Sequence, residues 1–326
     1  MLKFFARLLK WILIVFVLGI VALGAAWLYF GYSPIPPEPT LGATVESAIF
    51  EWQGMERTYT RYVPPQLPDN APLLVVLHGS VMNGAQMRIT TGYEFDQLAD
   101  RKGFVVLYPD GFKGHWNDCR RLPRFSAKKQ QIDDMGYLRA LIGQMQQRYH
   151  IDPHRIFVAG FSNGGHMAFR MRAEAPELVA GIAVAAASPS VAEDATCAPQ
   201  DDHSPVMMVN GTDDWLNAYA GGERLLPGIA QRGKVLASVE AARLFARHNG
   251  IYTEPVTDNL PDQDLDEDTS VQQLTWLLHG KPNVVLYTVE GGGHVIPQPE
   301  YRFPRMYGRT TGDLNFPVAV VDFFGL

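Results

Sequence analysis

Six short runs of apolar residues recur along this chain. They read PLLVVLHG, FVVLYPDG, IFVAGFS, GIAVAAAS, PVMMVNGT and NVVLYTVEGGGH, and they begin at positions 72, 104, 156, 181, 205 and 283. Continuous apolar strands of this length are typical of a parallel sheet that is covered on both faces. The segments 136–150, 164–176 and 235–250 read as helices between the runs. The sequence therefore predicts an α/β fold with a mostly parallel sheet and helices on both faces.

The same pattern predicts where a functional site would lie. In open α/β sheets, ligands bind at the carboxyl ends of the strands. Ser162, His294 and the adjacent pair Asp213 and Asp214 each come directly after one of the apolar runs. We therefore expect these side chains to meet at one edge of the sheet.

Ser162 lies between Gly160 and Gly164, where an apolar run changes into a helix-like segment. Glycine allows backbone angles and close approaches that other residues do not allow. The pattern G-x-S-x-G between a strand and a helix is the nucleophile elbow of α/β-hydrolases. A glycine-rich turn with a capping serine is the alternative interpretation of this pentapeptide.

A serine nucleophile needs a base that takes its proton and an acid that orients this base. In α/β-hydrolases these residues follow one another in the order serine, then aspartate or glutamate, then histidine. Ser162, either Asp213 or Asp214, and His294 follow that order. The sequence therefore predicts a catalytic triad, with either aspartate as the acid.

The negative charge of a tetrahedral intermediate needs hydrogen-bond donors that are already in place. The residue after the nucleophile, Asn163, is expected to supply one backbone N–H. The second is expected from the loop LHGSVMNG, in which Ser80 is the first choice and Val81 the alternative. This chemistry needs no metal or organic cofactor, and none is expected.

Several segments resemble the polyhydroxybutyrate depolymerase-like esterases, a family that includes feruloyl and acetylxylan esterases. The resemblance runs from about Pro72 to Phe324, and it depends on LHG, YPDG, HWNDC, DDMGYLRALI, DPHRIFVAGFSNGGHMAFRM, NGTDDWLNAYAGG and GGGHVIPQ. It implies an α/β-hydrolase fold and the hydrolysis of carboxylic esters.

The resemblance also implies roles for single residues. It makes Ser162 the nucleophile, His294 the base, and Asp214 the acid among the two adjacent aspartates. Trp116 and Asn117 match a Trp-Asn pair near the mouth of the family's active site. From this match we expect both residues to bind substrate.

The N-terminal residues form a separate region. No charged residue occurs from Trp11 to Tyr32, and about 20 apolar residues suffice to cross a bilayer as a helix. Lys3, Arg7 and Lys10 precede this span, so the positive-inside rule leaves the N-terminus in the cytoplasm and exports the rest. We predict a single-pass inner-membrane protein whose catalytic domain is periplasmic or extracellular. Secretion after signal-peptide cleavage is the alternative.

The predicted regions are a basic segment with a membrane anchor (1–32), a proline-rich linker (33–40) and a hydrolase domain (41–326). Four prolines in SPIPPEPT make the linker a stiff, extended spacer. Cys119 and Cys197 are the only cysteines, and export would allow a disulfide between them. Cysteines in similar places in exported relatives look suited to pairing. Two unpaired thiols are the alternative.

These observations predict an exported, membrane-anchored serine esterase that acts on small-molecule carboxylic esters. A peptidase of the same fold is an alternative, because the triad does not distinguish esters from amides. A catalytically silent envelope-binding protein on a hydrolase scaffold is another. The formal net charge of −6 gives no basic surface for nucleic acid, so nucleic acid is not expected as a partner.

Overall fold

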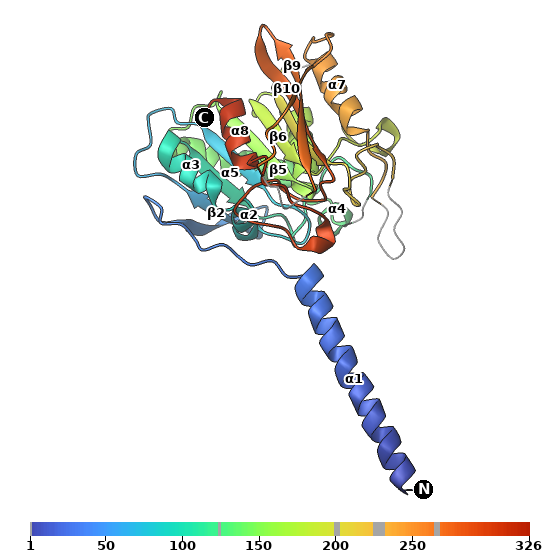
Figure 1. Cartoon of the computed structure of the whole chain (residues 1–326). Coiled ribbons are helices and arrows are strands. Elements are labelled where there is room, and N and C mark those ends of the chain that lie inside the picture. Colours follow the sequence, from blue (N-terminus) through green and yellow to red (C-terminus); the bar gives the residue numbers. More distant parts are fainter. Residues whose placement is uncertain (1, 123–124, 199–202, 224–231, 264–267) are drawn as a thin grey trace.

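All six apolar runs form strands, and these strands lie next to one another in one sheet (Figure 1). The computed structural model describes residues 2–122, 125–198, 203–223, 232–263 and 268–326. The predicted strands are β3 (Leu73–Leu77), β4 (Val105–Pro109), β5 (Ile156–Phe161), β6 (Gly181–Ala185), β7 (Val206–Gly211) and β10 (Lys281–Glu290). They run parallel, as predicted, and their order in the sheet is β4-β3-β5-β6-β7-β10.

Two antiparallel hairpins, which the sequence analysis did not predict, extend the sheet at its edges. They consist of β1 (Glu46–Trp52) with β2 (Met55–Tyr62), and of β8 (Val256–Asn259) with β9 (Ser270–Leu278). β2 pairs with β4 at one edge and β9 pairs with β10 at the other. β1 and β8 have no buried residue, and β2 and β9 mix polar residues with apolar ones, so these strands lack the continuous apolar runs of the central strands.

The three predicted helices correspond to α5, α6 and α7. The α-helices of the described residues are α1 (Leu2–Phe30), α2 (Gly84–Thr90), α3 (Glu94–Lys102), α4 (Ser126–Lys129), α5 (Asp134–Tyr149), α6 (Asn163–Glu174), α7 (Ser238–His248) and α8 (Phe316–Phe324). Two short 3₁₀ segments are η1 (Ala192–Asp194) and η2 (Arg305–Tyr307). Helices α5, α6 and α7 pack on one face of the sheet, and α2, α3 and α8 pack on the other.

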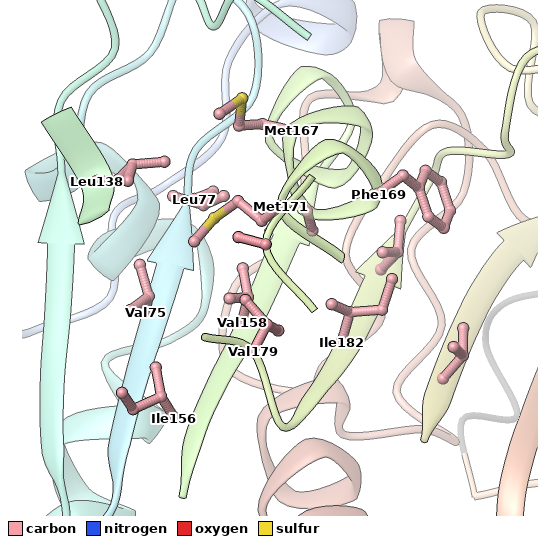
Figure 2. Close-up of a cluster of buried hydrophobic side chains, with 14 of the residues drawn as sticks. Val75, Leu77, Leu138, Ile156, Val158, Met167, Phe169, Met171, Val179 and Ile182 are labelled. Atoms are coloured by element: carbon pink, nitrogen blue, oxygen red, sulfur yellow. The ribbon is translucent and has the colours of Figure 1, made fainter. Parts of the chain in front are cut away.

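Alternation along the strands produces two hydrophobic layers. In β3, Val75 and Leu77 face the layer that contains α5, α6 and α7, and Leu74 faces the layer that contains α2, α3 and α8. In Figure 2, Met171 of α6 lies next to Leu77 of the central strands, and Met167 lies farther toward the strand ends. Full burial of one such aliphatic side chain contributes about 1.5–3 kcal/mol, so these layers hold the strand ends at fixed positions.

Helix α1 extends away from the domain (Figure 1). Its residues Arg7–Phe30 are long and apolar enough to cross a membrane, and the most hydrophobic part of this stretch is 0% buried within the protein. The proline-rich linker that follows α1 lies along the domain instead of holding it at a distance. Glu38 of the linker pairs with Arg88 of α2, and the Ser33 hydroxyl donates to the backbone carbonyl of Arg302.

Candidate active site

Ser162 lies at a sharp bend between β5 and α6. Its backbone angles are φ 52° and ψ −114°, a conformation that costs about 1–3 kcal/mol for a residue with a Cβ. The glycines beside it allow the bend. A Cβ atom on Gly164 would collide with the Leu77 carbonyl of β3, and a Cβ on Gly165 would collide with Val184 of β6. Close packing of the helix on the sheet thus holds the serine hydroxyl at the carboxyl end of β5.

Ser162, His294 and Asp214 form a continuous line of hydrogen bonds. The Ser162 Oγ lies 2.9 Å from His294 Nε2, and His294 Nδ1 lies 2.8 Å from Asp214 Oδ2. The exposed fractions of the three residues are 7%, 4% and 0%. The carboxylate of Asp214 is itself fixed in place, because its Oδ1 accepts hydrogen bonds from the backbone N–H groups of Leu216 and Asn217 at 2.7 and 2.8 Å.

The structure distinguishes between the two adjacent aspartates. The side chain of Asp213 is 63% exposed and faces Arg309 at 4.0 Å, away from His294. Its backbone N–H donates to the carbonyl of Gly292 at 2.9 Å. The backbone therefore turns Asp213 toward solvent and Asp214 toward the imidazole.

The loop after β10 positions His294. Its backbone N–H donates to the carbonyl of Tyr307 at 2.7 Å, and Gly293 donates to the carbonyl of Arg309 at 3.0 Å. A Cβ on Gly211 would collide with the Gly292 carbonyl, so the end of β7 and this loop are in close contact. This contact places Asp214 and His294 side by side although 80 residues separate them.

Two backbone N–H groups beside Ser162 are available for an oxyanion. In the part of the chain that the structure describes, the backbone N–H groups of Ser80 and Asn163 donate no hydrogen bond. The N–H of Val81 already donates to the carbonyl of Gly114 at 2.8 Å. The geometry therefore favours Ser80 over Val81, the choice that the sequence left open.

A cavity of about 500 Å³ opens beside Ser162. This volume is within the usual range for small-molecule sites. The lining is mainly apolar, with a few polar groups close to the serine. The lining residues are Ile35, Ser80, Val81, Met82, Gln86, Ile89, Thr90, Phe161, Ser162, Leu216, Arg232, His294, Tyr301, Phe303, Pro304 and Tyr307.

The family model described as esterase PHB depolymerase matches residues 57–223 of this chain. The chain belongs to this esterase family. Its relatives act as carboxylic-ester hydrolases, and so does this protein. The resemblance inferred from the sequence is confirmed.

Individual relatives are similar over most of the chain. NocK of Nocardia uniformis subsp. tsuyamanensis, which is named as an esterase, is 27% identical over 90% of this chain and 86% of its own. Poly(3-hydroxyalkanoate) depolymerase C of Paucimonas lemoignei is 25% identical, over 73% of this chain and 58% of its own. Acetylxylan esterase of Coprinopsis cinerea is 24% identical, over 89% of this chain and 76% of its own.

A solved structure confirms the α/β-hydrolase fold. The acetyl xylan esterase from Aspergillus awamori superimposes with a TM-score of 0.58. The match covers 87% of this chain and 99% of that one, at 16% sequence identity.

Trp116 and Asn117 of this esterase do not line the cavity beside Ser162. Trp116 is fully buried, its Nε1–H donates to the His78 carbonyl at 3.0 Å, and its backbone N–H donates to Asn163 Oδ1 at 2.8 Å. Asn117 donates from Nδ2 to the Ile132 carbonyl at 2.9 Å. Trp116 therefore contacts the elbow at Asn163, and Asn117 contacts the segment before α5, in contrast to the expected place at the mouth.

A buried charge cluster, which the sequence analysis missed, contacts the elbow at the side chain of Asn163. Asp118 accepts hydrogen bonds from Arg120 and, at 2.6 Å, from the Nδ2 of Asn163. Burial opposes ionisation of Asp118, but the charge and hydrogen bonds of Arg120 outweigh it and lower the pKa of Asp118 to about 2. Asp118 is part of the segment HWNDC, but nothing in that segment predicts which side chains it would contact.

Two further histidines near the site are kept neutral by burial. Burial lowers the pKa of His78 to about 4 and that of His166 well below its usual range. His78 Nε2 accepts from the Gly111 N–H at 2.8 Å, and its Nδ1 lies 2.7 Å from the Gly79 carbonyl. His78 thus shapes the loop after β3.

Cys119 and Cys197 form a disulfide, with their Cα atoms 5.5 Å apart. The predicted pairing is confirmed. Within the described residues, the side chains of Glu174, Cys119 and Cys197 lie close enough together to be considered as ligands of one metal ion. Because the two sulfurs are bonded to each other, they are not free thiolates, and this group is not a metal site.

Proposed function

We propose that this esterase uses Ser162, His294 and Asp214 as its catalytic triad. The observation that carries the proposal is the hydrogen-bonded line from Ser162 through His294 to Asp214, beside a cavity of about 500 Å³. The Nδ1–H bond to Asp214 fixes the imidazole tautomer, which leaves the lone pair of Nε2 directed at the serine hydroxyl.

Acylation follows from this geometry. The Ser162 Oγ forms a bond to the ester carbonyl carbon while its proton moves to His294 Nε2. The carbonyl π electrons move to oxygen, and the N–H groups of Ser80 and Asn163 stabilise this oxyanion. When the intermediate collapses, the ester C–O bond breaks and the alcohol leaves with the proton of His294. Water then repeats the two steps and releases the acid.

The protein is anchored by residues 1–32, and residues 33–40 connect this anchor to the hydrolase domain, residues 41–326. The uncovered apolar helix and the basic residues before it support anchoring with the domain exported. The disulfide between Cys119 and Cys197 supports an oxidising compartment. If the helix is an anchor, purified membrane protein keeps Met1 and stays with membranes after alkaline carbonate washing. Soluble protein that begins near Ala25 would show signal-peptide cleavage.

The natural substrates are esters that can reach a site held beside a membrane. A tethered enzyme meets soluble short-acyl or aryl esters, but it cannot diffuse to a solid polymer granule. We therefore expect turnover of p-nitrophenyl acetate and butyrate by the full chain and little clearing of a polyhydroxybutyrate suspension.

Kinetics of the full-length protein on a panel of p-nitrophenyl esters and peptide anilides tests the proposal. The expected result is ester turnover that Ser162→Ala abolishes, with little anilide hydrolysis. Faster hydrolysis of the anilides would favour a peptidase. A folded protein with neither activity would favour an envelope-binding protein.

A further inference from the structure

The end of α1 lies against the face of the domain that contains the catalytic cavity. The guanidinium of Arg305 lies 4.9 Å from the centre of the Tyr29 ring, and Ser33 donates to the carbonyl of Arg302. Ile35 of the linker itself lines the cavity that contains Ser162. The segment that joins the membrane helix to the domain is therefore part of the wall of the site.

The cavity must be close to the end of the membrane helix. Helix α1 ends at Phe30, and Ile35 follows five residues later. Five residues in a fully extended chain reach at most ~18 Å. Phe303 lines both the cavity beside Ser162 and a second one formed with Tyr29 and Phe30. The site and the helix end thus share one side of the domain.

Figure 1 agrees with this placement, because α2 and α4 lie at the end of the domain that is nearest to α1. Both helices follow the carboxyl ends of parallel strands, β3 and β4. The carboxyl edge of the sheet, where the triad lies, is therefore directed toward the membrane helix.

The side chains on this side of the domain suit a membrane surface. Trp27, Tyr29 and Tyr32 are more than half exposed at the end of α1, as is usual for aromatic residues at the lipid–water interface. Ile35 and Met306 add exposed apolar area beside them.

Two exposed arginines complete this surface. Arg302 and Arg305 lie in the segment that contacts the end of α1. Basic residues next to a membrane are attracted to anionic headgroups. The arginines, the exposed aromatic residues and the attached helix α1 all indicate that this side of the domain faces a lipid surface.

We propose that this side of the domain rests on the membrane and that the enzyme hydrolyses esters of amphiphiles held in the adjoining leaflet. The inference rests on the proposed esterase function and on α1 as an anchor. The apolar part of the amphiphile packs against the wall that Ile35, Ile89 and Phe303 provide, and its ester group reaches Ser162. The leaflet supplies substrate at high local concentration, directly at the mouth of the cavity.

Fluorescence quenching tests the orientation without requiring catalysis. Full-length protein with Met306→Cys, labelled at the new thiol, is reconstituted in phosphatidylcholine–phosphatidylglycerol vesicles that contain headgroup spin-labelled lipid. Tyr252→Cys is the matched control, because Tyr252 is 81% exposed and follows the carboxyl end of α7, at the opposite end of the domain. Strong quenching at 306 and weak quenching at 252 is expected. Equal quenching at the two positions, or none at 306, would overturn the orientation.

Kinetics in the same vesicles tests the substrate class. The rate on a long-chain p-nitrophenyl ester partitioned into the bilayer is compared with the rate on soluble p-nitrophenyl butyrate. Ile35→Asp should lower the ratio of these rates at least about fivefold, close to 1 kcal/mol. Ile49→Asp is the matched control on the exposed edge strand β1, and it should leave the ratio unchanged.

The two proposals fail in different ways. If butyrate is hydrolysed but the bilayer-borne ester is not preferred, or if Ile35→Asp leaves the ratio unchanged, the membrane substrate class is wrong and the esterase site stands. If neither ester is hydrolysed by a folded, reconstituted protein, the proposed catalytic function is wrong, and the quenching result still decides the orientation.

Discussion

Two buried aspartates flank the nucleophile elbow, and their partners differ. Asp214 accepts from two backbone N–H groups and from His294, which can gain and lose a proton. Asp118 accepts from Arg120, which is always charged, and from the side chain of Asn163. The exposed fractions of the two aspartates are 0% and 2%.

The difference shows how one residue type serves two purposes. A buried carboxylate paired with a permanent cation is a fixed structural element, because removing either charge leaves the other uncompensated. A buried carboxylate paired with an imidazole can stabilise a cation that forms only during the reaction. We therefore expect Asp214 to affect rate and Asp118 to affect stability.

The largest expected effect is on the rate of an Asp214→Asn variant. The amide cannot hold His294 in the tautomer that accepts the serine proton, and such a loss lowers kcat by roughly 10⁴ in serine triads. Asp213→Asn is the matched control and should change kcat less than about twofold, because its side chain is exposed and points away. Steady-state hydrolysis of p-nitrophenyl butyrate measures both. A larger loss in Asp213→Asn would reverse the assignment of the acid.

The next effect is on the stability of an Asp118→Asn variant. This change leaves the buried Arg120 without its counter-charge and should lower the free energy of unfolding by about 3–5 kcal/mol. Urea unfolding followed by circular dichroism measures the loss. Asp118→Leu combined with Arg120→Met should recover part of it, since the Asp118–Arg120 pair is then removed as a whole, while Lys128, whose Nζ lies 3.7 Å from Asp118, keeps its charge. If Asp118→Asn lowers kcat as strongly as Asp214→Asn and leaves stability intact, the two aspartates do not differ as proposed.

The smallest effect is on the pH dependence of stability. Folding lowers the pKa of Asp118 from 3.8 to about 2. This change corresponds to a stabilisation on the order of 2 kcal/mol. Because the folded-state pKa is lowered, this stabilisation is fully present above about pH 4 and is lost as the pH falls through 2. As the pH falls from about 4 to 2, the free energy of unfolding should decline less steeply in Asp118→Asn than in the unmodified protein. Equal slopes would show that Asp118 does not contribute.

The centre of the fold could be predicted because its strands are continuous apolar runs. Burial on both faces of a parallel sheet imposes this composition, and the strand ends then place Ser162 and His294 together. The edge hairpins have no such signal. In β2, Arg57 and Arg61 are buried, but the first pairs with Asp134 and the second with Glu46, so the strand looks polar in sequence.

Contacts between distant segments account for what the sequence could not predict. The orientation of Asp213 and Asp214 depends on the backbone of the loop after β10. The resemblance placed Trp116 near the site, but only its contacts with His78 and Asn163 show that it contacts the elbow and does not line the cavity. The course of the linker depends on an ion pair between residues 50 positions apart in the chain.

The central claim is that Ser162 is the nucleophile activated by His294. The most direct measurement is mass spectrometry of peptides from full-length protein that has reacted with a fluorophosphonate. We predict one adduct, on the peptide that contains Ser162, which is absent in Ser162→Ala and forms orders of magnitude more slowly in His294→Ala. A folded protein that forms no adduct, or one whose adduct persists in Ser162→Ala, would contradict the claim.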